Sequence, residues 1–269
     1  MTDASYSIEL KNISILRNKT RILDDISFKV PEGITTVILG PLGCGKSTFL
    51  KTLASIYLPD EGKLIINNKP YNSISSENIK KFRRDTGFVF QDSALWSNKS
   101  LYQNLELPLL FHYPELTTED ILKKIRKTLD SLGFEDNLGK RPSDISSGNR
   151  KLISFARALV TDPALLMIDG PESSLDFSSL EKIRKILRDL KEKGKTMLIC
   201  TYDQTITSML ADYLVILYKN RIYAHGLYRD IIKSKDPVIQ NILSHVLDRI
   251  SNFDDDLLNL MNQDKSDWY

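Results

Sequence analysis

Residues 40–47 read Gly40-Pro41-Leu42-Gly43-Cys44-Gly45-Lys46-Ser47, and Thr48 follows directly. The stretch matches the pattern G-x-x-x-x-G-K-[ST] in full. Glycine lets a backbone curl tightly, so that several N–H groups of such a loop converge on phosphate oxygens. These residues therefore predict a phosphate-binding loop, and they decide how the rest of the chain is interpreted.

The sequence on either side of the loop supports this prediction. Residues 36–39 form a continuous apolar run, which is typical of a buried parallel strand. Apolar residues then recur at helical spacing over 47–57, so the loop is expected at a helix N-terminus, where negative charge is stabilised. We expect ATP to bind here with Mg²⁺, with Lys46 reaching the β- and γ-phosphates and Ser47 coordinating the metal. The alternative is a glycine-rich turn with a solvated lysine. It does not explain why a buried strand precedes the loop and a helix follows it.

Composition and charge limit the class of protein. The 269 residues are 41% hydrophobic and 27% charged, which suits one large or two small globular lobes. The 37 basic and 35 acidic side chains nearly balance, so we expect no nucleic acid as main partner. Cys44 and Cys200 are predicted to be free thiols in a cytosolic protein. Without a signal peptide or an apolar run of membrane-spanning length, the chain is expected to be cytoplasmic and to reach a membrane through partners.

The rest of the chain alternates strands with helices. A helix is expected to be capped by Ser178, with Glu181 three residues on, and a last helix is expected at 238–250. The predicted strands are 8–10, 26–30, 36–39, 63–67, 165–169, 196–201, 213–218 and 221–224. This order predicts an α/β fold with a mostly parallel sheet.

A second lobe is predicted between Gln91 and about residue 150. Thr118 is the expected N-cap of a helix that ends at Gly133 and carries one apolar stripe, formed by Ile121, Leu122, Ile125, Leu129 and Leu132. We therefore divide the chain into a core (1–91 and 151–235), a helical lobe (92–150), and a C-terminal helix with an acidic tail (236–269). The strand at 165–169 ends in Asp169, and a carboxylate at a strand tip can hold Mg²⁺ through water.

Between the loop and Asp169 lies Asp144-Ile145-Ser146-Ser147-Gly148-Asn149-Arg150, followed by Phe155-Ala156-Arg157-Ala158-Leu159. In this order the motifs resemble those of ATP-binding cassette (ABC) ATPases, over about residues 7–235. The resemblance implies an ABC-type P-loop NTPase with an N-terminal antiparallel β subdomain and an inserted helical subdomain. It also implies that Gln91 is the Q-loop glutamine and a Mg²⁺ ligand, and that Asp176 is the D-loop aspartate.

The signature motif departs from the family pattern. The family's LSGGQ is ISSGN here, which keeps Ser146 and Gly148 but places Ser147 and Asn149 where a glycine and a glutamine are usual. Three further stretches resemble ATPases of Mce-type lipid transporters, the maintenance-of-lipid-asymmetry group. These are residues 91–96, 224–226 and 236–240.

Two replacements bear on the chemistry that the resemblance implies. The family's catalytic glutamate after the strand-end aspartate is Gly170 here, and the switch-loop histidine is Tyr202. Because a positioned base contributes about a hundred- to ten-thousand-fold to rate, we expect weak or absent hydrolysis at this site and intact ATP binding. The alternative is that Glu172 takes the role of the missing glutamate, although Pro171 fixes the intervening turn.

The resemblance also implies partners. Family ATPases pair head to tail, so a second ABC ATPase subunit is expected, in a homodimer or a heterodimer. A transmembrane permease subunit is expected to dock near Trp96 and the leucines at 95, 107, 109 and 110, unless these are lobe core. Arg17, at the position of the family's adenine-stacking aromatic, either stacks on the base or is a solvated strand-end arginine.

Two functions remain open from sequence alone. One is a transport subunit that binds ATP in a membrane complex, with lipid as the expected cargo. The other is a sensing or scaffolding subunit that binds ATP without turnover. Cassette proteins of DNA repair or translation are disfavoured, because the chain has neither a long coiled-coil insertion nor a second cassette. The acidic tail, which contains apolar residues such as Leu257 and Trp268, either clasps a partner ATPase or is a solvated end.

Overall fold

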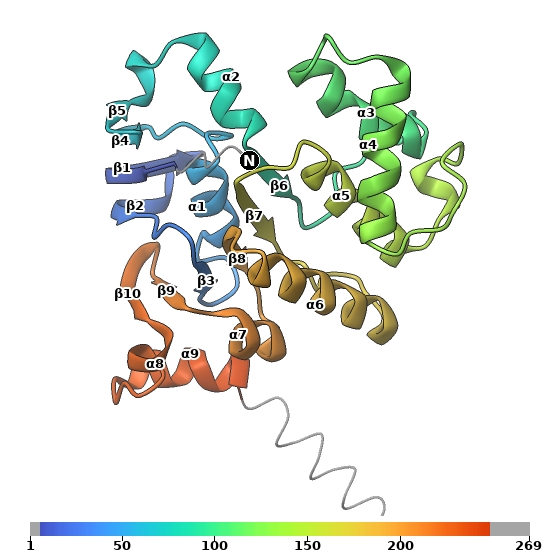
Figure 1. Ribbon diagram of the computed structural model, residues 1–269. Coiled ribbons are helices and arrows are strands. Elements are labelled where there is room, and N and C mark those ends of the chain that lie inside the picture. The colour runs from blue at the N-terminus through green and yellow to red at the C-terminus, as the bar shows by residue number, and fades with distance from the viewer. Residues whose placement is uncertain (1–5, 248–269) are drawn as a thin grey trace, which may run out of the picture.

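The computed structural model describes residues 6–247, in which two β-sheets are covered by helices (Figure 1). The larger sheet has the strand order β10-β9-β3-β8-β7-β6, and the smaller sheet has the order β2-β1-β4-β5. Neighbours from β9 to β6 in the larger sheet are parallel, and β10 pairs antiparallel with β9. The smaller sheet is antiparallel. The predicted α/β fold with a mostly parallel sheet and an antiparallel subdomain is confirmed.

The strands of the described residues are β1 (Ile8–Arg17), β2 (Thr20–Lys29), β3 (Thr35–Leu39), β4 (Glu61–Ile66), β5 (Lys69–Pro70), β6 (Thr86–Val89), β7 (Leu165–Asp169), β8 (Thr196–Cys200), β9 (Tyr213–Tyr218) and β10 (Arg221–Leu227). The α-helices are α1 (Lys46–Leu53), α2 (Ser76–Arg84), α3 (Leu101–His112), α4 (Thr118–Ser131), α5 (Ser147–Leu159), α6 (Phe177–Glu192), α7 (Gln204–Leu210), α8 (Tyr228–Ile231) and α9 (Pro237–Leu247). Short 3₁₀ turns occur at η1 (Tyr71–Ser73) and η2 (Pro142–Asp144). None of the helices within 6–247 has the length and apolar character needed to cross a bilayer.

The central strands are buried on both faces. In β3, Val37 and Leu39 face one hydrophobic cluster and Ile38 faces the other. This alternation explains why the central strands read as continuous apolar runs, since side chains on both faces of a covered parallel sheet leave water. The strand that precedes the phosphate loop is therefore anchored from two sides.

One of these clusters lies between the two sheets, around α1. Phe49, Leu50 and Leu53 of α1 are fully buried there, together with Ile8 and Leu10 of β1. The smaller sheet thus covers the helix that follows the phosphate loop. Burial of these side chains contributes about 1.5–3 kcal/mol each, so the start of α1 is held rigidly.

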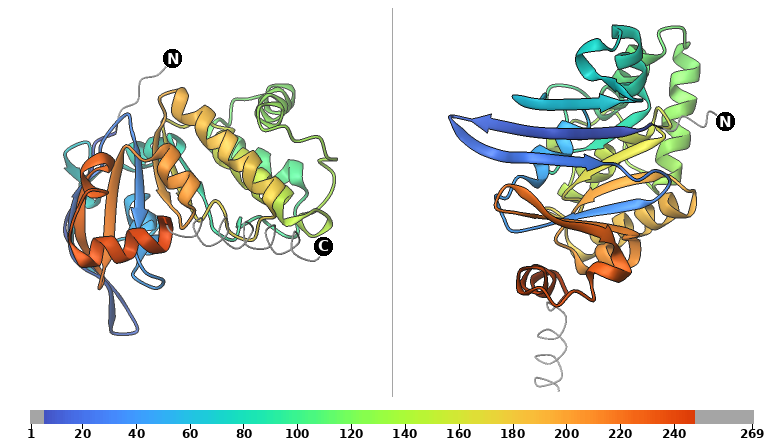
Figure 2. Two further views of the ribbon diagram at one scale, coloured as in Figure 1. Left: turned by 90° about the horizontal axis from the view of Figure 1, so that it is seen from below. Right: turned by 90° about the vertical axis from the view of Figure 1, so that its left-hand side faces the viewer.

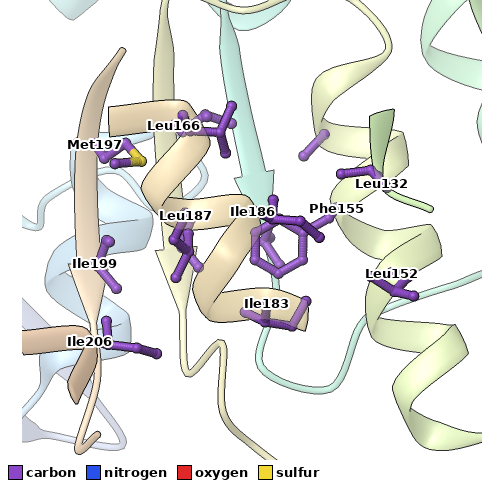
Figure 3. Close-up of a cluster of buried hydrophobic side chains, with 14 of the residues drawn as sticks. Leu132, Leu152, Phe155, Leu166, Ile183, Ile186, Leu187, Met197, Ile199 and Ile206 are labelled. Atoms are coloured by element: carbon purple, nitrogen blue, oxygen red, sulfur yellow. The ribbon is translucent and has the colours of Figure 1, made fainter. Parts of the chain in front are cut away.

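The second cluster joins the larger sheet to α5, α6 and α7. Figure 3 shows Phe155 of α5 beside Ile183 and Ile186 of α6, with Leu166 of β7 and Ile199 of β8 on the sheet. Helices α3 and α4 pack with α5 and extend this cluster, on the side of the molecule away from the smaller sheet (Figures 1 and 2). The range predicted for the helical lobe (92–150) contains α3 and α4 and ends inside α5.

The helix after the phosphate loop ends earlier than predicted. The helix after the loop ends at Leu53 and not at residue 57, because Ser55 is left-handed (φ 55°) and the amides of Ile56 and Tyr57 turn back to one carbonyl, that of Lys51. The last helix is described as far as Leu247, so the end predicted at residue 250 and the tail lie outside the described residues.

Two predicted helix caps were also off by one or two positions. Thr117, not Thr118, caps α4, because its hydroxyl accepts the Asp120 amide at 3.2 Å. Asp176, not Ser178, caps α6, where its carboxylate accepts the Ser179 amide at 2.7 Å. In each case the capping residue precedes the first helical residue and its side chain reaches the third amide. Asp176, which the sequence resemblance predicts to be the D-loop aspartate, is therefore a helix cap.

Candidate nucleotide site

The loop between β3 and α1 follows a path that requires glycine. Gly40 is left-handed (φ 152°), and a Cβ there would lie 2.2 Å from the Leu217 carbonyl oxygen of β9. Gly45 precedes α1 with φ 97°, and a Cβ there would lie 2.8 Å from the Ile22 carbonyl oxygen of β2. Because both neighbours are backbone atoms, they could not move aside cheaply. The glycines therefore allow the loop to pass between the two sheets.

The side chain of Lys46 is folded back over this loop. Its Nζ donates to the carbonyl oxygens of Gly40 at 2.8 Å and Pro41 at 2.9 Å, and also to the hydroxyl of Tyr202. The ammonium lies 4.3 Å from the centre of the Tyr202 ring, within the range of a cation–π interaction. The residue predicted to replace the switch-loop histidine thus directly contacts the phosphate-binding lysine.

Ser47 and Asp169 meet as predicted for a metal site. The Ser47 hydroxyl, in the first turn of α1, donates to Asp169 Oδ1 at 3.0 Å, and Asp169 lies buried at the end of β7. Burial raises the pKa of Asp169, against the Ser47 hydrogen bond and the positive charges of Lys51, Lys151 and Lys46. A hydroxyl beside a carboxylate is a hard oxygen donor set, which fits Mg²⁺.

A cavity of about 300 Å³ surrounds these groups. Its wall includes Gln91, so the structure brings the predicted Q-loop residue to Ser47 and Asp169. The cavity is lined by Ile22, Leu42, Gly43, Gly45, Lys46, Ser47, Thr48, Gln91, Asp169, Gly170, Glu172, Ser173, Cys200 and Tyr202. No cluster of three His, Cys, Asp or Glu side chains that could hold a metal occurs within residues 6–247. Mg²⁺ at Ser47 and Asp169 would rely on water and phosphate oxygens as further ligands.

A tight turn follows Asp169 and determines where the next carboxylate points. Gly170 is left-handed (φ 54°), and its carbonyl accepts the Ser173 amide at 3.1 Å across a turn with Pro171 in the second position. Glu172 Oε1 accepts the Tyr202 amide at 2.8 Å, and its Oε2 accepts the Thr201 hydroxyl at 2.9 Å. Both carboxylate oxygens are thus used to hold the segment after β8. This geometry argues against Glu172 as a substitute for the missing glutamate.

Lys151 is a site residue that the sequence analysis missed. It lies on α5 with 1% of its surface exposed, and its Nζ donates to the carbonyl oxygens of Gln91 at 2.7 Å, Phe90 at 3.3 Å and Gly170 at 3.3 Å. The amine therefore ties the loop after β6 to the turn after β7. Helical spacing could have predicted that Lys151 is buried, because it lies four residues before Phe155, on the same face of α5.

The signature residues lie at the N-terminus of α5, outside the wall of the cavity. Ser146 caps the helix, its hydroxyl accepting the Asn149 amide at 3.1 Å. Ser147 and Asn149 are half-buried, whereas Gly148 is buried so closely against α6 that a Cβ would lie 2.1 Å from Ser179 Oγ. Residue 148 therefore has to be a glycine for α5 and α6 to pack, independently of any ligand.

Arg17 contacts a neighbouring tyrosine ring, away from the cavity wall. Arg17, at the end of β1, places its guanidinium 4.5 Å from the centre of the Tyr57 ring and does not line the cavity.

In the region predicted to dock a permease, Trp96 is 58% exposed, and Leu110 is also exposed. Leu109 is fully buried, so the interpretation as lobe core applies to that leucine.

The loop, the strand-end aspartate and the sheet order together define a P-loop nucleotide-binding protein. Residues 23–173, more than half of the chain, match the sequence pattern of the family "ABC transporter". The chain therefore belongs to the ABC transporter family, as an ATP-binding subunit. This is the family that the sequence motifs resemble.

Two similar sequences illustrate the relationship. The chain is 30% identical over 239 residues to the "Probable ribonucleotide transport ATP-binding protein mkl" of Mycobacterium leprae, covering 88% of this chain and 69% of that protein. It is 34% identical over 258 residues to the "Sulfate/thiosulfate import ATP-binding protein CysA" of Mesostigma viride, covering 95% and 71%.

Solved structures agree on the fold. The dimeric structure of MJ0796, a bacterial ABC transporter cassette, superposes with a TM-score of 0.74 at 29% identity, covering 82% of this chain and 98% of that one. The structure of cbiO1 from Clostridium perfringens, part of the ABC transporter complex cbiONQ, superposes with a TM-score of 0.71 at 27% identity, covering 93% and 99%.

Proposed function

We propose that this chain binds ATP with Mg²⁺ in a transporter complex and hydrolyses it slowly, if at all, at its own site. The observation that carries the proposal is the assembled contact between Ser47 and Asp169 beside Lys46, with Gly170 where the base would stand. Binding needs the loop amides, Lys46 and metal ligands, and the proximity of Lys46, Ser47 and Asp169 supports it. Turnover also needs a positioned base, and both oxygens of Glu172 already accept hydrogen bonds that hold this carboxylate against the segment after β8.

The residues fit Mg²⁺ together with phosphates. Ser47 and Asp169 would hold the metal, with Gln91 beside them, and the metal would supply positive charge opposite the phosphates. Lys46 would hold the β- and γ-phosphates, and the N-terminus of α1 would add its partial positive charge. The chain's own residues thus account for ground-state binding.

The proposed partners are a second ABC ATPase and a transmembrane permease on the cytoplasmic face of the membrane. The MJ0796 cassette is a dimer, and cbiO1 is part of a transporter complex, which supports this arrangement. Trp96 and Leu110, which are both exposed, are the proposed contacts with the permease. In a dimer with an intact partner, Ser146 and Gly148 would face the partner's nucleotide.

Lipid is the proposed class of cargo, and it rests on residues 91–96, 224–226 and 236–240, which resemble Mce-type ATPases. A second candidate function is a regulatory subunit that binds ATP without turnover. The contact of Tyr202 with Lys46 favours it, because it would make ATP binding depend on the position of a side chain of this chain, which suits sensing of nucleotide without turnover.

The proposal is tested by measuring nucleotide affinity and phosphate release on the purified chain. We expect Mg²⁺-dependent ATP binding, and loss of that Mg²⁺ dependence in Asp169→Asn, with phosphate release near background. Rapid phosphate release by the wild-type chain would contradict slow turnover, and failure to bind any nucleotide would contradict the function as a whole.

A gain-of-function variant sharpens this test. A Cβ on Gly170 would lie 2.6 Å from Ser173 Oγ, so Gly170→Glu is combined with Ser173→Ala to make room, and with Tyr202→His. Because residue 170 is left-handed, the new glutamate costs about 1–2 kcal/mol of stability. We expect turnover to rise by about a hundredfold or more. Ser173→Ala with Tyr202→His, but with Gly170 retained, is the matched control.

A further inference from the structure

Every hydrogen-bond donor of the phosphate-binding lysine is used within the protein. Lys46 carries three N–H donors, and three oxygens accept them, two from the loop backbone and one from Tyr202. Cys44 Sγ lies further from the same nitrogen, at 3.8 Å. The loop carbonyls belong to the fold of the loop itself, so the Tyr202 hydroxyl is the oxygen that a phosphate can replace.

A second cavity begins on the other side of Tyr202. It measures about 630 Å³ and lies between the start of the phosphate loop and α9. Its wall is largely apolar and is formed by Gly40, Pro41, Leu42, Tyr202, Tyr218, Pro237, Val238, Asn241 and Ile242. Tyr202 lines this cavity and also the nucleotide cavity. The ring therefore stands between a polar space and an apolar one that is large enough to receive it.

The backbone around Tyr202 is held firmly, whereas its side chain is not. Its amide donates to Glu172, and the next residue, Asp203, pairs with Arg184 of α6 and caps α7 by accepting the Ile206 amide. The Tyr202 side chain is bonded through its hydroxyl, and the residue is 41% exposed. A change at this position is therefore a rotation of the side chain, which requires no movement of the loop.

We propose that the Tyr202 hydroxyl competes with the terminal phosphate of ATP for Lys46, and that its ring turns into the cavity beside α9 when ATP binds. Tyr202 is then a specificity-determining residue that lowers affinity for ATP relative to ADP. The inference rests on the proposed function, in that nucleotide binds at the loop. ADP serves as the reference ligand because it offers Lys46 the β-phosphate alone, and so meets less of this competition than ATP does.

The first test removes the competitor. Affinities for ATP and ADP are measured by calorimetry on the wild-type chain, Tyr202→Phe and Tyr202→Ala. Loss of one hydrogen-bonded competitor is expected to tighten ATP binding by about two- to tenfold, with ADP affinity changed much less. Tyr202→Phe keeps the ring over Lys46 and isolates the hydroxyl. An ATP-to-ADP affinity ratio unchanged in both variants would overturn the proposal.

The second test blocks the space into which the ring turns. Val238→Trp fills the cavity beside α9, and Ile242→Phe is a second filling variant should the first unfold. Either is expected to weaken ATP binding several-fold when Tyr202 is present and to have little effect in a Tyr202→Ala background. Val238→Ala, which enlarges the cavity, is the matched control. Equal weakening in both backgrounds would mean that the substitution damages the site directly, and would overturn the proposal.

The two proposals fail in different ways. If neither ATP nor ADP binds to the wild-type chain or to the Tyr202 variants, the proposed function fails and this inference fails with it. If both nucleotides bind, and the affinity ratio is insensitive to Tyr202 and Val238, the proposed function stands and this inference alone is wrong. Binding of ATP by the Tyr202 variants but not by the wild-type chain would be the strongest form of the predicted competition.

Discussion

Replacement of Lys151 tests whether one buried amine holds the nucleotide site together. Lys151→Met keeps the length of the side chain and removes its charge and its donors. The bond to the Gln91 carbonyl, at 2.7 Å, joins a charged donor to a buried backbone oxygen, and the bonds to Phe90 and Gly170 are longer at 3.3 Å. All three carbonyls lose the amine, but those of Phe90 and Gly170 keep the amides of Ser93 and Ser173 as donors, so the main loss is the bond to Gln91.

The expected change in the free energy of unfolding is the balance between the hydrogen bonds that are lost and the desolvation cost that is relieved. Hydrogen bonds from a charged group contribute about 1.5–3 kcal/mol, and an orphaned buried acceptor costs about 1–3 kcal/mol. Against this, burial lowers the pKa of Lys151 in spite of the attraction of Glu172, Asp169 and Asp92, so methionine relieves a desolvation cost. We expect a net loss of about 2–4 kcal/mol. That loss corresponds to about 2–4 °C in Tm for each kcal/mol in a chain of this size.

The assay is thermal and urea-induced unfolding of Lys151→Met, with Lys127→Met as the control. Lys127 is an exposed lysine on α4, and its replacement is expected to change stability by less than about 0.5 kcal/mol. Nucleotide affinity is measured in parallel, since Gln91 and the turn at Gly170 lose a shared anchor. Equal stability of the two variants would refute the reasoning, because the amine would then make no net contribution to the fold.

Two further predictions concern the loop and the helical lobe. Gly40→Ala is expected to destabilise the fold by more than about 2 kcal/mol, because its Cβ would lie 2.2 Å from the Leu217 carbonyl oxygen. Gly33 is also left-handed but has nothing within 4 Å of an added Cβ, so Gly33→Ala reports the backbone strain alone. Similar losses of stability for the two variants in urea unfolding would rule out the clash. Burial and the nearby charges of Lys80 and Arg84 lower the pKa of His112, so the unfolded chain takes up a proton first and stability falls as pH drops below 6.5. His112→Leu should flatten that fall between pH 7.5 and 5.5, and an unchanged pH dependence would count against the assignment.

Much of the site was predictable because its chemistry is local. The phosphate loop needs consecutive residues in one order, so residues 40–47, with a buried strand before them and a helix after them, identify it from sequence alone. Asp169 follows from the apolar strand that it ends. Gly170 and Tyr202 followed from the family pattern, which specifies the residue types expected beside those motifs. These features depend on spacing along the chain, and the sequence determines spacing.

What only the tertiary structure decided are the contacts between segments distant in the chain. The hydroxyl of Tyr202 reaches Lys46 across 156 residues, and Glu172 closes on the amide of Tyr202 from another strand end. Lys151 becomes a site residue because α5 packs across the ends of β6 and β7. The physical reason is that parallel strands bring their carboxyl ends to one edge of the sheet, and which side chains meet there depends on strand order and helix packing. The sequence of the phosphate loop indicates that phosphate binds; the fold determines which side chain competes for the lysine.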